Sequence, residues 1–339
     1  MNPFFNENDA GRLEALLAAS EAHPQKLPAY IIEKDFYVTC ILQILYLELA
    51  PKFTSICPAP FIFKGGTSLS KCHSLISRMS EDIDLSFSMD LFGEKEVQRD
   101  PKRGRGKMQE EAEAIDDKAR SFVEAELLEP LTAALKSLDK RIEVEVENHE
   151  PLHIGIRYPS VVEEGRAVLR RVLLETGSLS QNNPVAPVSI THMLGDFIEN
   201  FKEEPFFVVA LNPERTLLEK MFAVHCNLMS DTKKSKYARH LYDILQLHKK
   251  NNNWCEDKSL MDDLVEFCDI HYRTNKNYCD TARKGPLLLA PKNEEMLRHY
   301  TSDWDAMADM FPFGELPYKF DELLKGITAL EEHVNKVYY

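Results

Sequence analysis

The sequence lacks the features that mark several common classes of protein. Its seven cysteines are scattered and form no C-x-x-C pair, which excludes a zinc knuckle or a disulfide framework and is typical of reduced thiols. The first residues do not combine a basic start with an apolar run, and no stretch of about 18 uncharged apolar residues stands out. We therefore expect a cytoplasmic protein without a membrane span.

Net positive charge is lacking too. The formal net charge is −14, which disfavours non-specific binding to nucleic acid, because Lys and Arg must neutralise the phosphates in such binding. A contact with nucleic acid would therefore need a local basic patch. Two patches are present, and solvated surface charge explains each of them equally well. The first is Arg99, Lys102, Arg103, Arg105 and Lys107, and the second is Lys233, Lys234, Lys236 and Arg239.

The pattern of apolar residues changes along the chain, whose 339 residues favour two lobes over one. Residues 1–50 have helical spacing, residues 51–185 contain alternating runs such as RIEVEVEN, and residues 186–339 are helical in pattern almost to their end. We predict an α+β fold with N-terminal helices, a core with a mixed sheet of about four or five strands, and a C-terminal helical bundle. The charged stretch 93–120 is expected to be an exposed excursion that leads into a surface helix.

A glycine turn is the first candidate site. It lies between the short apolar run FIF and a segment with helical character. Glycines let the backbone approach an anion, and the free N–H groups at a helix start point toward it, so the turn is a candidate phosphate-binding site. An ordinary strand-to-helix turn explains such a short motif as well. The residues of the turn are Lys64, Gly65, Gly66, Thr67 and Ser68.

A pair of carboxylates follows the glycine turn. Asp82 and Asp84 are two residues apart in the alternating run DIDLSF, so both side chains point to the same face of a strand. A bound Mg²⁺ would relieve their mutual repulsion, since this ion takes oxygen ligands and uses one or two carboxylates together with substrate phosphates. The alternative is a solvated strand face.

A third metal ligand is harder to assign from spacing. Glu175, in the run VLLE, is our candidate, because a neighbouring strand would bring it to the first two carboxylates. The alternating run RIEVEVEN offers competing carboxylates, namely Glu143, Glu145 and Glu147.

The helical part of the chain adds charged candidates. Lys220 lies on an amphipathic helix, where a compact cation would serve to bind a triphosphate, although most lysines on a helix surface are simply solvated. Arg239 and Asp243 are four residues apart on one helix face, which fits either a salt bridge or a pair facing a nucleotide. His225 lies in an apolar pattern without another His or Cys at ligand spacing, so we interpret it as a core histidine.

Six blocks of sequence together resemble the AbiEii/AbiGii nucleotidyltransferase toxins of abortive-infection and toxin–antitoxin systems, and they occur in the order of that family. The blocks are IEKDFYVT (32–39), KGGTSLSK (64–71), SEDIDLSF (80–87), VLLETGS (172–178), PERTLLEKMFAVH (213–225) and ARHLYDILQL (238–247). The stretch MADMFPFGELPYKFDELL (307–324) is similar to the C-terminal part of the family.

The resemblance implies a DNA polymerase β-like core with a helical lobe, and an enzyme that uses an NTP and a divalent metal such as Mg²⁺. Asp82, Asp84, Lys220 and Asp243 would be catalytic, and Glu175 matches a glutamate that recurs in the family. Gly66, Thr67 and Ser68 match the motif that binds phosphate in the family, and Lys64 and Gly65 adjoin it. Arg239 is our candidate for nucleotide binding from its position on the helix.

The resemblance also implies a biological role. The acceptor of the NMP would be a hydroxyl at a tRNA 3′ end, the effect would be a block of translation or phage growth, and a cognate antitoxin would be a partner. Two other functions remain open, namely nucleotidylation of a protein or small molecule and a non-catalytic, nucleotide-binding partner protein.

Overall fold

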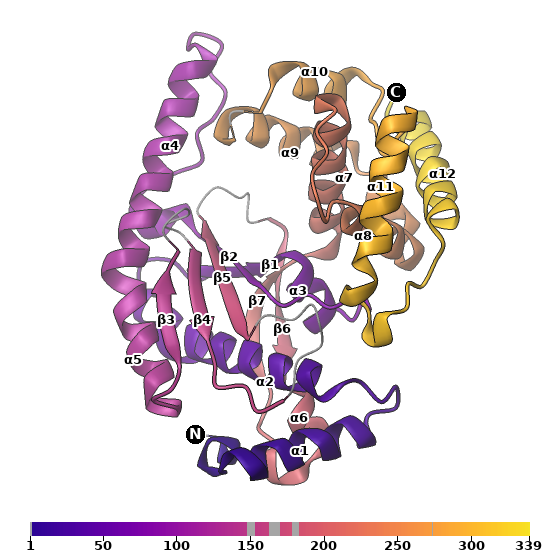
Figure 1. Cartoon of the computed structure of the whole chain (residues 1–339). Coiled ribbons are helices and arrows are strands. Elements are labelled where there is room, and N and C mark those ends of the chain that lie inside the picture. Colours follow the sequence, from indigo (N-terminus) through magenta and orange to yellow (C-terminus); the bar gives the residue numbers. More distant parts are fainter. Residues whose placement is uncertain (1, 148–152, 163–169, 178–182, 273) are drawn as a thin grey trace. The chain divides into compact units, whose positions relative to one another are not determined.

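The computed structural model describes residues 2–147, 153–162, 170–177, 183–272 and 274–339 (Figure 1). Contacts between residues divide the chain into two compact units. The first unit contains Met1–Ser74, Arg78–Lys95 and Ala114–Leu211. The second contains Leu75–Ser77, Glu96–Glu113 and Asn212–Tyr339. The chain therefore leaves the first unit and returns to it twice before it finally enters the second.

A seven-stranded mixed sheet organises the first unit, with the strand order β3-β4-β5-β2-β1-β7-β6. The pairs β1–β7 and β2–β5 are parallel, and the other neighbours are antiparallel. Ile83, Leu85 and Phe87 of β2 and Val172 and Leu174 of β5 are buried in the core. The strands are β1 (Phe61–Lys64), β2 (Ile83–Phe87), β3 (Glu143–Val146), β4 (His153–Arg157), β5 (Arg171–Gly177), β6 (Val185–Ile190) and β7 (Phe206–Leu211).

The predicted α+β class is confirmed, but the sheet is larger than the four or five strands expected. The two additional strands, β6 and β7, lie after residue 185, in a stretch for which the sequence analysis expected a loop and then helices. Pro187 made β6 difficult to predict as a strand, because proline is rare inside sheets. It is tolerated here because β6 is the edge strand and needs no ladder hydrogen bond on its outer side. The run FFVVAL of β7 is continuously apolar, although Phe207 is exposed, and periodicity alone does not separate such a short apolar run from part of a helix.

The helices of the first unit bury their apolar side chains against this sheet in one hydrophobic core. They are α1 (Asp9–Ala22), α2 (Ala29–Gln43), α3 (Gly65–Lys71), the second half of α4 (Arg105–Phe122), α5 (Leu128–Leu138) and the short α6 (Met193–Phe197). Beyond Gln43, α2 continues as a π-helical turn.

One helical run is long and apolar enough to cross a membrane by length and composition, which the sequence analysis did not anticipate. This run, Ala29–Phe53, contains α2, and 67% of its most apolar window is buried inside the protein. It packs in the core of the first unit, where Phe36, Ile41 and Leu45 are almost inaccessible to solvent. The core thus accounts for its apolar character.

The second unit is helical, as predicted, apart from its connecting segments. Its large buried side chains include Trp304, Tyr300, Tyr242 and Phe267. Pro213 occupies the first turn of α7, where its missing N–H costs nothing. The helices are the first half of α4, α7 (Pro213–Ser230), α8 (Ala238–Lys250), α9 (Lys258–His271), α10 (Lys276–Lys284), α11 (Glu294–Ala306) and α12 (Phe320–Tyr338).

Candidate functional site

The glycine turn lies directly against the carboxylate strand. Helix α3 begins at Gly65, immediately after β1, and Gly65 has a φ of +75°. A Cβ at this position would come within 1.8 Å of Oδ2 of Asp84. A Cβ at Gly66 would come within 2.5 Å of Oγ of Ser80 and 3.0 Å of Nη2 of Arg78. Both glycines are therefore required sterically, and they bring the first two motifs together.

The side chains of Thr67 and Ser68 point into the protein. Thr67 is 3% exposed, and its hydroxyl donates to the carbonyl oxygen of Asp82 and contacts Oγ of Ser80 at 3.1 Å. Ser68 is 2% exposed. These side chains fix the turn beside β2, so the backbone of the turn is the part left to face an anion, together with half-buried Lys64.

Strand pairing aligns four polar residues in one row across the sheet. Lys64 of β1 is in register with Asp84 of β2, and Asp84 is in register with Glu175 of β5. His153 of β4 is in register with Glu175. Residues in register on neighbouring strands project to the same face, so the row continues from the glycine turn to β4. Asp82, two residues before Asp84, belongs to the same face.

This topology distinguishes Glu175 from its three competitors. Glu143 and Glu145 lie on β3, at the edge of the sheet, with β4 and β5 between them and β2. Glu145 forms an ion pair with Arg157 at 2.7 Å, and Glu147 pairs with Arg171. Only Glu175, of these four carboxylates, is on the strand next to Asp84.

The carboxylates fit a divalent cation by their chemistry. Asp82, Asp84 and Glu175 are half-buried and offer hard oxygen ligands on neighbouring positions, as Mg²⁺ prefers. Among the residues that the structure describes, no three His, Cys, Asp or Glu side chains are already grouped tightly enough to enclose a metal ion. A site of two protein carboxylates completed by substrate phosphates agrees with both observations.

Lys34 is a buried lysine beside this site, and it was not among the residues predicted from the sequence. Nζ of Lys34, on α2, lies 2.9 Å from Oε2 of Glu81 and donates to the carbonyl oxygen of Arg171. Burial lowers the pKa of Lys34, while the negative charges of Glu81 and Asp82 oppose that shift. Lys34 thus ties the segment that carries Asp82 to the first residue of β5.

The two residues that flank Lys34 anchor α2 to other segments. Glu33 accepts hydrogen bonds from the backbone N of Val161 at 2.8 Å and from the hydroxyl of Ser160 at 2.6 Å. Asp35 pairs with Lys71, at the end of α3, at 2.6 Å. The block IEKDFYVT therefore has a physical role: three adjacent charges on one helix connect three parts of the first unit.

In the second unit, Lys220 and Asp243 form a buried ion pair. Nζ of Lys220, on α7, is 3.0 Å from Oδ2 of Asp243, on α8. Lys220 is 8% exposed and Asp243 is inaccessible. Removing one partner of such a pair leaves an uncompensated buried charge, so both residues contribute to the stability of this unit as well as to any chemistry.

Two further predictions concern α7 and α8. Arg239 is half-buried on α8, one turn before Asp243, whose carboxylate is paired with Lys220. His225 is inaccessible, and both of its ring nitrogens are used: Nδ1 contacts the backbone N of Leu288 at 3.0 Å, and Nε2 contacts the carbonyl oxygen of Tyr278 at 3.1 Å. The interpretation of His225 as a core histidine is confirmed.

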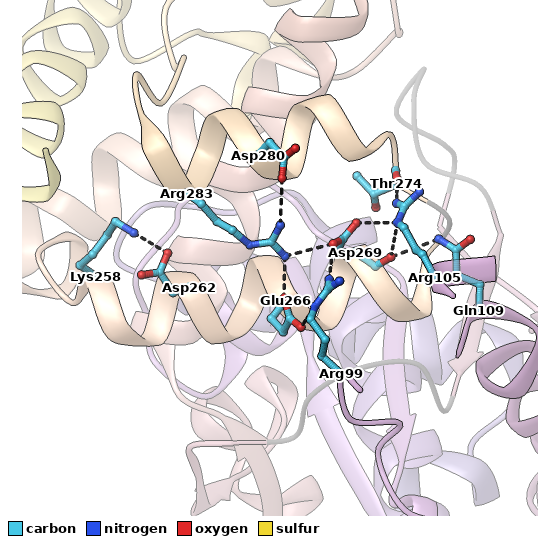
Figure 2. A network of polar contacts seen from close by, with 10 residues as sticks. All are labelled: Arg99, Arg105, Gln109, Lys258, Asp262, Glu266, Asp269, Thr274, Asp280 and Arg283. Atoms are coloured by element: carbon cyan, nitrogen blue, oxygen red, sulfur yellow. Dashed lines mark hydrogen bonds and ion pairs between the residues drawn. The ribbon is translucent and has the colours of Figure 1, made fainter. Parts of the chain in front are cut away.

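The part of the charged stretch 93–120 that lies in the second unit, Glu96–Glu113, is not a free basic loop, and from here on we call this part the excursion. Figure 2 shows Arg99 and Arg105 from the segment Glu96–Glu113 converging on Asp269 of α9, together with Arg283 of α10. Nε of Arg105 is 2.8 Å from Oδ1 of Asp269, and Nη2 of Arg283 is 3.1 Å from Oδ2. Arg99 pairs with Asp269 and with Glu266. We name this set of ion pairs the Asp269 cluster.

The Asp269 carboxylate is 1% exposed. Burial raises its pKa, but the charge of Arg105 and the hydrogen bonds from Arg283 and Arg99 outweigh burial and hold the pKa below its usual range. The guanidinium groups of Arg99 and Arg105 therefore serve to attach the excursion to α9. The sequence analysis missed this role because the acidic partners are more than 150 residues away.

The mixed sheet, the glycine turn and the carboxylate row define an α+β protein with the elements of a nucleotidyl-transferring enzyme. The family model described as nucleotidyl transferase AbiEii toxin, type IV TA system, matches residues 54–326. The chain therefore belongs to the AbiEii family of nucleotidyltransferase toxins, which confirms the resemblance stated from the sequence. Toxins of type IV systems act with an antitoxin, so an antitoxin partner and an NTP substrate follow from the family.

A solved structure is similar to this chain at low identity. It is described as MenT4, nucleotidyltransferase toxin Rv2826c from Mycobacterium tuberculosis H37Rv. The two chains are 15% identical, the similarity covers 98% of each, and the TM-score is 0.44. No curated protein matches the sequence significantly.

Proposed function

We propose that this toxin transfers an NMP from an NTP to an acceptor hydroxyl, and that the reaction takes place at the face of the sheet where the carboxylate row meets the glycine turn. The observation that carries the proposal is the register of Lys64, Asp84 and Glu175 beside a turn in which Gly65 leaves room only for the Asp84 carboxylate. This register supports the proposal, because a backbone suited to phosphate and oxygen atoms suited to a divalent cation would then be neighbours.

The residues have separate tasks in this proposal. Asp82 and Asp84 would hold a divalent cation, Mg²⁺ in our proposal, which supplies charge neutralisation at the triphosphate when bound. The backbone of residues 64–66 binds phosphate oxygens, and Lys64 adds a positive charge in the same row. The acceptor hydroxyl loses its proton to solvent as its oxygen forms a bond to the α-phosphorus. The bond between the α-phosphorus and the bridging oxygen breaks, and pyrophosphate leaves with that oxygen. Lys220 and Asp243 stand as predicted catalytic residues of the second unit.

We further propose that the acceptor is RNA, specifically a tRNA 3′ end, and that its modification blocks translation or phage growth. Membership of the family of type IV toxins supports a target inside the cell that produces the toxin, and hence a cytoplasmic location. The net charge of −14 favours a rival acceptor, a protein or a small molecule, unless a local basic surface overcomes it.

The test is transfer of label from each α-³²P-NTP to the RNA, protein and small-molecule fractions of a lysate. We expect Asp82→Asn and Asp84→Asn to abolish transfer while the thermal unfolding midpoint stays within a few degrees, because half-buried carboxylates contribute little to stability. Asp90→Asn, at an exposed position shortly after β2, is the matched control and should transfer normally. Mg²⁺-dependent transfer by both site variants would contradict the assignment.

A further inference from the structure

The sequence contains two basic clusters, and they differ in the number of acidic side chains that accompany the basic ones. The excursion Glu96–Glu113 belongs to the second unit and carries as many acidic as basic side chains. Its basic residues are Arg99, Lys102, Arg103, Arg105 and Lys107, and its acidic residues are Glu96, Asp100, Glu110, Glu111 and Glu113. A segment without net charge gives little attraction for a polyanion.

Three of the five basic side chains in the excursion are already paired. Arg99 and Arg105 belong to the Asp269 cluster, and Arg103 pairs with Glu111 at 2.6 Å. Nε of Arg105 contacts the Asp269 carboxylate, which is 1% exposed, and Nη2 of Arg105 donates to the carbonyl oxygen of Thr274 (Figure 2). Two of these three arginines are thus bound to a buried carboxylate, and the excursion offers a polyanion few unpaired cations.

The second basic cluster, in contrast, has an excess of positive charge. The segment DTKKSKYAR (231–239) contains one acidic residue, Asp231, and four basic residues. Residues 231–236 are all exposed. Within the described parts of the chain, neither Lys234 nor Lys236 forms an ion pair, whereas Lys233 pairs with Glu295. We name residues 231–236 the lysine turn.

The backbone of the lysine turn is held in place by hydrogen bonds, although its residues are exposed. Nζ of Lys234 lies 5.3 Å from the centre of the Tyr237 ring. The buried carboxylate of Asp303 accepts hydrogen bonds from the backbone N of Lys236 and, at 2.7 Å, from that of Ala238. Nδ2 of Asn227 donates to the carbonyl oxygen of Thr232 at 2.8 Å. A fixed turn loses little conformational entropy when it binds a ligand.

The lysine turn also leads directly to predicted catalytic residues of the same unit. It ends at α8, where Arg239 lies one helical turn before Asp243, and Asp243 is paired with Lys220. The lysine turn and Arg239 are therefore close in the chain to Asp243, a predicted catalytic residue.

We propose that the lysine turn, with Arg239, is the surface that binds the phosphodiester backbone of an RNA acceptor, and that the excursion is not. This inference rests on the proposed transferase function and names the acceptor surface that overcomes the net charge of −14. Lys234 and Lys236 contact phosphates of the acceptor, while the NTP binds elsewhere, at the glycine turn.

The test is fluorescence anisotropy with fluorescein-labelled bulk tRNA over a series of KCl concentrations. The double variant Lys234→Gln/Lys236→Gln should lose at least about tenfold in affinity at 100 mM KCl. Its slope of log K against log salt should flatten by roughly 1.4 to 1.8, since each lost phosphate contact removes about 0.7 to 0.9. The matched control is Lys102→Gln/Lys107→Gln, which removes two exposed lysines from the excursion and should bind within about twofold of the unaltered protein.

Three outcomes overturn the inference: an unchanged slope in the lysine-turn variant, an equal or larger loss in the excursion variant, or no binding of tRNA by the unaltered protein. The Asp84→Asn variant separates this inference from the transferase function, because it should bind tRNA normally without transferring label. Label that enters only a protein or small-molecule fraction, without tRNA binding, would overturn the RNA surface and leave the transferase function standing. Normal tRNA binding without transfer to any fraction would overturn the transferase function alone.

Discussion

Gly65 shows how a single residue joins two motifs of the site. Its φ of +75° suits glycine, and its missing side chain makes room for the Asp84 carboxylate. Gly93 has a similar φ of +66°, but a Cβ there would meet nothing within 4 Å. The two glycines therefore share a backbone requirement and differ only in what surrounds them.

We expect Gly65→Ala to reduce nucleotidyl transfer about 100-fold or more, because the new methyl group displaces the Asp84 carboxylate, and misplacement of a reacting group by about 1 Å has this effect. Gly93→Ala is the control: this position also has a positive φ, with a strain of about 1 to 2 kcal/mol for a residue with a Cβ, but it lacks the steric clash. Transfer rates and urea unfolding of both variants check the prediction. Equal transfer by the two variants would show that Asp84 has room to move.

The sequence predicted the individual residues of the carboxylate row better than their arrangement. The two-residue spacing is enough to place Asp82 and Asp84 on one face. The choice of Glu175 over Glu143, Glu145 and Glu147 depends on strand order, which no local pattern contains. His153 and Lys34 were missed for the same reason, since register and tertiary packing bring them to the row.

At the scale of elements, the helices were predictable where amphipathic periodicity is long, as in α7, α8 and α9. The strands β6 and β7 were not, because neither the edge strand with Pro187 nor the continuously apolar run FFVVAL has the alternation of polar and apolar residues that marks a half-buried strand. The excursion was correctly expected to lead into a helix, α4. Its attachment to α9 depends on ion pairs with distant residues and was not predictable.

The Asp269 cluster makes the excursion a structural element of the second unit. We expect Asp269→Asn to destabilise the protein by about 3 kcal/mol, because a buried carboxylate that neutralises three guanidinium groups is lost. Amide hydrogen exchange in residues 96–113 should accelerate, since Arg99 and Arg105 lose their shared partner.

Lys102→Gln is the control for this prediction. Lys102 is exposed on the same segment, so its substitution should change stability by less than about 0.5 kcal/mol and leave hydrogen exchange unaltered. Chemical unfolding and hydrogen-exchange mass spectrometry provide the two measurements. Unchanged exchange in the Asp269 variant would mean that other contacts hold the excursion in place.

At the scale of the whole molecule, acid should weaken the fold in a defined pH window. Burial lowers the pKa of His271 to about 4, from an ordinary value near 6.5. The unfolded chain therefore binds a proton that the folded chain does not, and the stability that His271 provides while neutral is lost as the pH falls from about 6.5 to about 4.

The size of this loss is about 3 kcal/mol, from a shift of roughly 2.5 pKa units at 1.36 kcal/mol each. The variant His271→Phe keeps the stacked ring against Phe267 and removes the titrating group, so its stability should depend less on pH in this window. Urea unfolding of both proteins at pH 7, 6, 5 and 4 measures the difference. Parallel pH dependence in the two proteins would assign the acid sensitivity to other groups.

The interleaving of the two units along the chain has a consequence for dissecting this toxin genetically. The second unit contains Leu75–Ser77, where Ser77 contacts the Tyr242 hydroxyl at 2.8 Å, and it also contains the excursion with Arg99 and Arg105. A gene fragment that ends at codon 211 would encode these segments without the residues that they contact. The complementary fragment would encode Tyr242 and Asp269 without Ser77, Arg99 and Arg105. No single cut in the reading frame yields either unit intact, so split-protein reassembly, domain swaps between homologues and truncation mapping each need at least two junctions.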